Sequence, residues 1–163
     1  GYTARRIARA LEATGWEVLG TGRDAALSFD DEGMVRLALA DASHVLSSVP
    51  PGGEGLDPVL ERYGAALSGK WLGYLSSTGV YGDCGGARVS ETRSPAAKSA
   101  RAARRVDAER RLRRFGRQRG RLCRVSILRE KHGIPPEAAV AKCLPHVTRS
   151  AAPTPAGREP ALT

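Results

Sequence analysis

The sequence predicts an α/β fold with an open parallel sheet, because strand-like and helix-like segments alternate along most of its 163 residues. Residues 71–75 (Trp-Leu-Gly-Tyr-Leu) are an apolar run typical of a buried strand, and residues 44–49 (His-Val-Leu-Ser-Ser-Val) form a second such run. Between them, Asp57-Pro58 starts a segment with helical periodicity. Parallel neighbouring strands need a crossover of this kind, so the order favours a parallel sheet.

Length and composition indicate one globular domain with a strongly basic charge. Hydrophobic residues make up 41% of the chain, which suffices for a core in a domain of this size. The 26 Lys and Arg residues exceed the 17 Asp and Glu residues, so the formal net charge is +9. Anionic ligands such as phosphates or nucleic acid would therefore be attracted. Twelve of the basic residues lie between Lys98 and Arg124.

The cysteines are Cys84, Cys123 and Cys143, and their odd number and wide spacing argue against a disulfide framework and for a reducing compartment. Cys143 and His146 have half of the spacing of a zinc site, but no second pair lies nearby in the sequence, so no metal site is predicted. No apolar run reaches the roughly 18 residues of a membrane span, and no signal peptide opens the sequence. We therefore expect a cytoplasmic protein that does not bind a membrane.

The first part of the sequence is predicted to form a helix followed by a strand. Ile7 and Leu11 lie at helical spacing and Gly15 ends the segment, so the helix begins almost at the first residue. Residues 16–21 are expected to form the strand. Residues 27–29 could form another short strand, but too few residues separate it from the first for a parallel crossover. Either residues 27–29 are not a parallel strand or a helix is missing there.

Two further helices follow from the apolar spacing. One spans residues 33–42 and has four apolar residues on one side: Met34, Leu37, Ala38 and Ala42. The other begins at Pro58 with Asp57 as its N-cap. Its expected buried face consists of Val59, Leu60, Tyr63 and Leu67.

The C-terminal part is predicted to contain a basic helix over about residues 96–119 and a last strand within 122–128. The apolar seam of the helix is thin and comprises Ala108, Leu112 and Phe115. Prolines and small polar residues dominate residues 132–163, which we expect to be a disordered tail. The sequence thus predicts a folded domain over residues 1–131 and a Pro-rich segment after it.

Candidate site residues follow the strand at 71–75. Ser76, Ser77 and Thr78 come directly after it, and ligands of open parallel sheets bind beyond the carboxyl ends of the strands. Taken without context, a Ser-Ser-Thr-Gly run after a strand is also typical of a turn that satisfies backbone groups.

A second candidate site lies at the start of the sequence. If a strand and a glycine preceded Gly1, then Gly1 and Ala4 would be the second and third positions of Gly-x-Gly-x-x-Ala, the turn that binds a dinucleotide. Arg23 follows the predicted strand at 16–21, where a basic residue accepts the 2′-phosphate of NADP. The alternative for Arg23 is a solvated side chain in a turn.

The stretch Ser76-Ser77-Thr78-Gly79-Val80-Tyr81-Gly82-Asp83 resembles the extended short-chain dehydrogenase/reductases, the NAD-dependent epimerase/dehydratase superfamily. It is followed by Val89-x-Glu91-x-x-x-Pro95 and a helix with Glu109, which is the order that the family has. The resemblance covers roughly residues 1–128.

The resemblance implies a Rossmann-like doubly wound parallel sheet that holds NAD or NADP and acts on carbonyl or alcohol substrates, including nucleotide sugars. NADP is slightly favoured because of Arg23. The implied catalytic residues are Ser77, Thr78 and Tyr81, with the hydrogen bond to the substrate oxygen falling on Ser77. The implied cofactor-binding residues are Gly1, Tyr2, Ala4, Arg23, Ser48, Pro50 and Arg105.

The sequence departs from the family at the Tyr-x-x-x-Lys pair. Counting back from Glu109 by the family's spacing places Arg101 at the tyrosine position and Arg105 at the lysine position. Arginine can bind phosphate or ribose, but with a pKa above about 12 it cannot exchange protons near neutrality.

Two structural departures accompany it. The family's first strand is absent, and residues 132–163 do not match its C-terminal substrate domain, so we expect a truncated, atypical member. The missing initial methionine also fits a fragment or a processed product.

The sequence leaves two alternative functions open. One is a catalytically inactive cofactor binder or truncated relic, and the other, less favoured, is nucleic-acid binding through residues 98–124. The oligomeric state is left open.

Overall fold

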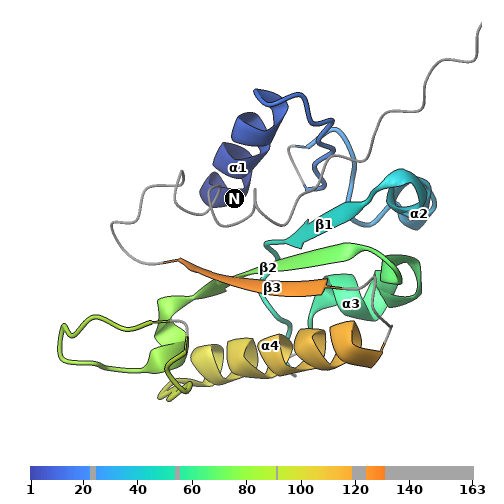
Figure 1. Cartoon of the computed structure of the whole chain (residues 1–163). Coiled ribbons are helices and arrows are strands. Elements are labelled where there is room, and N and C mark those ends of the chain that lie inside the picture. Colours follow the sequence, from blue (N-terminus) through green and yellow to red (C-terminus); the bar gives the residue numbers. More distant parts are fainter. Residues whose placement is uncertain (23–24, 54–55, 91, 119–123, 131–163) are drawn as a thin grey trace, which may run out of the picture.

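The computed structural model describes residues 1–22, 25–53, 56–90, 92–118 and 124–130. Its centre is a parallel sheet with the strand order β1-β2-β3 (Figure 1). The strands are β1 (His44–Ser47), β2 (Trp71–Ser77) and β3 (Arg124–Glu130). The α/β prediction is confirmed, and the strands expected at 44–49, 71–75 and 122–128 are all present within a few residues of their predicted bounds.

Strand β2 is covered on both faces. Successive side chains of a strand point to opposite faces, and residues 71 to 76 are all buried. Helix α1 (Tyr2–Glu12) packs on one face, while α3 (Pro58–Tyr63) and α4 (Ala100–Gln118) pack on the other (Figure 1). A strand that is buried on both faces consists of a nearly continuous run of apolar residues. The sequence therefore predicts β2 from its apolar run.

The α1 face of β2 requires a glycine at position 73. Ile7 of α1 packs with Trp71 and Leu75. A Cβ at Gly73 would lie 2.6 Å from the Trp71 ring and 2.8 Å from Leu46. The Trp71 ring therefore occupies the space above Gly73.

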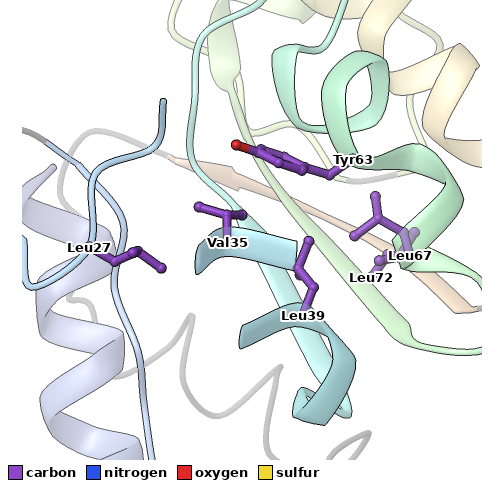
Figure 2. Packing of buried hydrophobic residues seen from close by; sticks show 6 residues of the cluster. All are labelled: Leu27, Val35, Leu39, Tyr63, Leu67 and Leu72. Carbon is purple, nitrogen blue, oxygen red and sulfur yellow. The ribbon is translucent and has the colours of Figure 1, made fainter. Parts of the chain in front are cut away.

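The opposite face is filled from several segments. Figure 2 shows Leu72 of β2 beside Leu67 in a buried cluster. The other members of the cluster are Leu27, Tyr63 and the α2 residues Val35 and Leu39. Leu67 belongs to the short 3-10 helix η1 (Gly64–Leu67), which continues α3. Segments far apart in the sequence thus share one core.

Helix α2 (Glu32–Asp41) forms where predicted, but of its predicted apolar side Ala38 packs against the core while Met34 and Leu37 do not. Val35 and Leu39 are buried, whereas Met34 and Leu37 are 51% and 65% exposed. The helix has apolar residues almost all round, so spacing by itself did not select a face. Packing against Tyr63 and η1 selects it.

The predicted start of α3 is confirmed. The Asp57 side chain accepts a hydrogen bond from the Leu60 backbone N–H at 2.9 Å, and Pro58 occupies the first turn. Of the expected buried face, Tyr63 and Leu67 are fully buried, while Val59 and Leu60 are half-buried.

The strands predicted at 16–21 and 27–29 do not form. In the part of the chain that the structure describes, the two segments meet at an isolated parallel bridge between Thr21 and Leu27. The Gly22 backbone N–H donates to the Leu27 carbonyl at 3.0 Å. A β-strand needs a series of backbone hydrogen bonds to a neighbouring strand. Parallel strands need a crossover of a dozen or more residues, and these two segments are too close in the sequence for more than one bridge.

Helix α4 (Ala100–Gln118) begins later than predicted. The Ala96 N–H donates to the Val80 carbonyl at 2.8 Å, and this bond holds residue 96 outside the helix. Its buried stripe is also wider than the predicted seam and includes Ala102, Val106 and Glu109. Exposed arginines cover its outer side: Arg101, Arg110, Arg111, Arg113, Arg114 and Arg117. The tail predicted at 132–163 lies outside the described residues.

We predict that Gly73→Ala lowers the free energy of unfolding by about 1–3 kcal/mol, because the added methyl group displaces the Trp71 ring from a packed face. Urea unfolding followed by circular dichroism measures this. Gly53→Ala is the control, since a Cβ at Gly53 has no neighbour within 4 Å. Equal losses in the two variants would contradict the packing of Trp71 over Gly73.

Candidate functional site

The candidate site lies at the carboxyl ends of β1 and β2. Ser47 of β1 pairs with Tyr74 of β2, so β2 extends three residues beyond β1. Ser77 at the end of β2 and Thr78 after it are both half-buried. Ser48 and Pro50, which follow β1, are exposed. The parallel sheet therefore brings the predicted hydroxyl residues after β2 to the same edge as Ser48 and Pro50, the predicted cofactor residues after β1.

Directly after β2 the chain turns through the 3-10 helix η2 (Thr78–Tyr81). Val80 and Tyr81 pack against Val106 of α4, and Tyr81 is only 2% exposed. Gly82 has φ +69, and a Cβ there would collide with the Ala96 carbonyl oxygen. Within the motif, Ser77 and Thr78 thus keep partial access to solvent, while the Tyr81 ring belongs to the core.

A buried hydrogen bond joins β2 to α4 at Ser76. Its Oγ donates to Glu109 Oε1 at 2.6 Å, and the two residues are 1% and 3% exposed. In the sequence, Glu109 belongs to the motif order that resembles the family and marks the positions of Arg101 and Arg105. Its partner could not be found from the sequence, because 33 residues separate the two.

Arg105 makes a second polar link between α4 and β2. Its Nη1 donates to the Leu75 carbonyl at 2.8 Å and to the Tyr74 hydroxyl oxygen at 3.3 Å. Its guanidinium carbon lies 5.9 Å from the centroid of the Tyr74 ring. These are structural contacts of Arg105; the cofactor contact implied for it stays a prediction.

Burial raises the pKa of Tyr74 to about 12, and the nearby Arg105 charge only partly offsets this effect. The Tyr74 hydroxyl is therefore protonated near neutrality. A phenol with this pKa is poorly suited to remove a proton from a substrate at pH 7.

A buried carboxyl group lies below the end of β1. Asp57 is 2% exposed, and Ser47 Oγ donates to its Oδ2 at 3.3 Å. Burial raises the pKa of Asp57, while hydrogen bonds from the Leu60 N–H and Ser47 act in the opposite direction. This carboxyl caps α3 and is not one of the predicted site residues.

The N-terminal candidates lie at the start of α1. Gly1 precedes the helix, Tyr2 is 68% exposed, and Ala4 packs beside the cluster of Ile7, Trp71 and Leu75. A small residue at position 4 allows this close approach of the helix to the sheet. Arg23 lies outside the described residues, as do Cys143 and His146.

Within the described ranges, no three His, Cys, Asp or Glu side chains come together as metal ligands. The same part of the chain contains no helix that is both long and apolar enough to cross a membrane.

Comparison with known proteins finds likeness in structure. No protein-family model matches the sequence, and no curated protein matches it either. A conserved protein of unknown function from Silicibacter pomeroyi is 35% identical, with a TM-score of 0.55, over 71% of this chain and 46% of that one.

Two further structures are more distant in sequence. A candidate epimerase from Burkholderia cenocepacia is 23% identical with a TM-score of 0.60, and MoeE5, solved with UDP-glucose and NAD, is 20% identical with a TM-score of 0.56. Each match covers 79% of this chain and 50% of the other. The chain thus spans about half the length of the structures it matches. These likenesses confirm a Rossmann-like α/β fold with a parallel sheet.

We predict that Ser76→Ala lowers the free energy of unfolding by about 1–3 kcal/mol, because the buried Glu109 carboxylate loses its hydroxyl donor. Urea unfolding measures the loss. Ser77→Ala is the matched control, since Ser77 is the half-buried neighbour on the same strand. A loss no larger than that of the control would show that this hydrogen bond does not stabilise the fold.

A second prediction concerns pH. The pKa of Asp57 is raised above 3.8 in the folded state, so the folded chain holds a proton there that the unfolded chain releases. Stability from this group is present below pH 3.8 and is lost as the pH rises through the folded pKa. As the pH rises from below 3.8 toward neutrality, wild type should therefore lose stability relative to Asp57→Asn. Urea unfolding across this range tests it, and a constant or opposite difference would contradict the raised pKa.

Proposed function

We propose that this chain is a dinucleotide-binding domain related to the extended short-chain dehydrogenase/reductases, and that it holds NADP or NAD next to a carbonyl or alcohol substrate. The observation that carries the proposal is the Ser77-Thr78 pair at the carboxyl end of the central strand β2. Ligands of open parallel sheets bind at this edge. The likeness in fold to MoeE5, which was solved with UDP-glucose and NAD, supports it.

The chain's own residues fit a dinucleotide in two respects. Ala4 lets α1 approach the sheet closely, as the third position of a dinucleotide turn must, and Ser48 and Pro50 are exposed at the β1 end of the same edge. A bound nicotinamide would supply hydride transfer. Ser77 would donate a hydrogen bond to the substrate oxygen, with Thr78 beside it and Tyr81 supporting the turn from the core.

A second candidate function is cofactor binding without catalysis. It is favoured by the environment of Arg105, whose Nη1 donates to Tyr74 and to the Leu75 carbonyl. Burial raises the pKa of Tyr74 to about 12, so it releases its proton less readily than an ordinary tyrosine. Arginine cannot act as the proton shuttle that the family's Tyr-Lys pair provides. NADP or NAD binding with no turnover would distinguish this candidate from an active enzyme.

We predict that the chain binds NADP more tightly than NAD and that Arg23→Glu weakens NADP binding by about tenfold or more without weakening NAD binding. The reason is the loss of a charge-assisted contact with the 2′-phosphate. Calorimetric titration with each dinucleotide measures both affinities, and the fluorescence of Trp16 and Trp71 gives a second signal.

The control is Arg117→Glu, which makes the same charge change on the exposed side of α4. Similar losses in both variants would mean that NADP is attracted by net charge only. If wild type binds neither dinucleotide at millimolar concentration, the proposed function is wrong.

A further inference from the structure

A cavity of about 280 Å³ lies between α4 and the loop at residues 92–95. Three arginines line it: Arg93 from the loop and Arg110 and Arg113 from α4. The hydroxyl residues Thr92 and Ser94 also line it. None of the residues predicted to bind the cofactor belongs to this cavity, so it is a second location separate from the candidate dinucleotide site.

Two of the three arginines that line the cavity have no ion pair with a described residue. Among the described residues, neither Arg93 nor Arg113 forms a salt bridge. Arg110 pairs with Asp107 at 3.4 Å, but both side chains are more than half exposed, so the pair is screened by water. Bringing guanidinium groups together around one cavity costs free energy that a bound anion would offset.

One carboxylate also lines the cavity and opposes an anion there. Glu109 is 3% exposed, and its Oε1 accepts a hydrogen bond from Ser76. The three arginines outnumber it. Glu109 also connects the cavity to β2, because Ser76 directly precedes the candidate residue Ser77.

We propose that this cavity binds the phosphate group of a small phosphate monoester. Guanidinium groups donate paired hydrogen bonds that match the oxygens of a phosphate, and the Ser94 hydroxyl can donate a further one. Thr92 Oγ1 already shares a hydrogen bond of 2.7 Å with Ser90 Oγ. The volume of about 280 Å³ is slightly below the range of about 300–1,000 Å³ in which drug-sized ligands bind. The volume therefore suits a phosphate group with a small substituent, and ribose 5-phosphate is a convenient probe of this class.

Calorimetric titration of the full chain with ribose 5-phosphate and with inorganic phosphate, at constant ionic strength, tests the proposal. Wild type should bind ribose 5-phosphate more tightly than inorganic phosphate. Arg93→Gln and Arg113→Gln should each weaken ribose 5-phosphate binding by about tenfold or more, because each removes charge-assisted hydrogen bonds.

The matched controls are Arg111→Gln and Arg114→Gln, which remove the same charge from exposed positions of α4 that do not line the cavity. They should bind ribose 5-phosphate as wild type does. Equal losses in cavity and control variants would show attraction to the net charge of +9 instead of a site, and would overturn the proposal. Because Arg93 and Arg113 are exposed, far-UV circular dichroism should confirm that all variants fold alike.

Two other outcomes overturn the assignment. Inorganic phosphate binding as tightly as ribose 5-phosphate would show that the cavity does not recognise an ester. Displacement of ribose 5-phosphate by NADP would show that the phosphate belongs to the dinucleotide. Dinucleotide binding is measured separately in the titrations above, so its absence would leave the phosphate result intact.

Discussion

The burial of β2 on both faces is the constraint on which the other described elements depend. Trp71 and Leu75 receive α1 on one face, and Tyr74 receives α4 through Ala108 and Leu112 on the other. β1 and β3 pair with β2 along its two edges. Most of β2 has no solvent-exposed side. The position of each neighbouring helix therefore follows from the side chains of β2 that it buries.

Burial also explains why polar groups link β2 to α4. The Ser76 hydroxyl and the Tyr74 hydroxyl point toward a helix, where unsatisfied polar groups would be costly. Glu109 accepts from Ser76, and Arg105 donates to Tyr74 and the Leu75 carbonyl. Because these partners lie four residues apart on α4, one face of the helix satisfies both. The bonds set the position of α4 along β2, and with it the position of η2 against Val106.

The same contacts bear on the chemistry of the candidate site. Arg105, a residue implied at the cofactor, donates to two groups of β2, and burial raises the pKa of Tyr74 to about 12. Ser77 and Thr78 remain half-buried at the strand end, where a ligand would lie. The arginines at residues 93, 110 and 113 line a separate cavity between α4 and the loop at residues 92–95.

Local sequence determined the elements with the strongest local causes: the apolar run of β2, the Asp57-Pro58 start of α3, and the helical spacing of α1. Placement of Ser77 and Thr78 after the central strand also followed from order along the chain. The sequence did not determine which face of α2 is buried, because apolar residues lie on more than one side of this helix. Packing against Tyr63 and η1 buries Val35 and Leu39 and leaves Met34 and Leu37 exposed. Nor did the sequence determine whether residues 16–21 become a strand, which depends on a hydrogen-bonding partner. The Ser76–Glu109 bond and the arginine-lined cavity join residues distant in sequence, so only the tertiary structure brings them together.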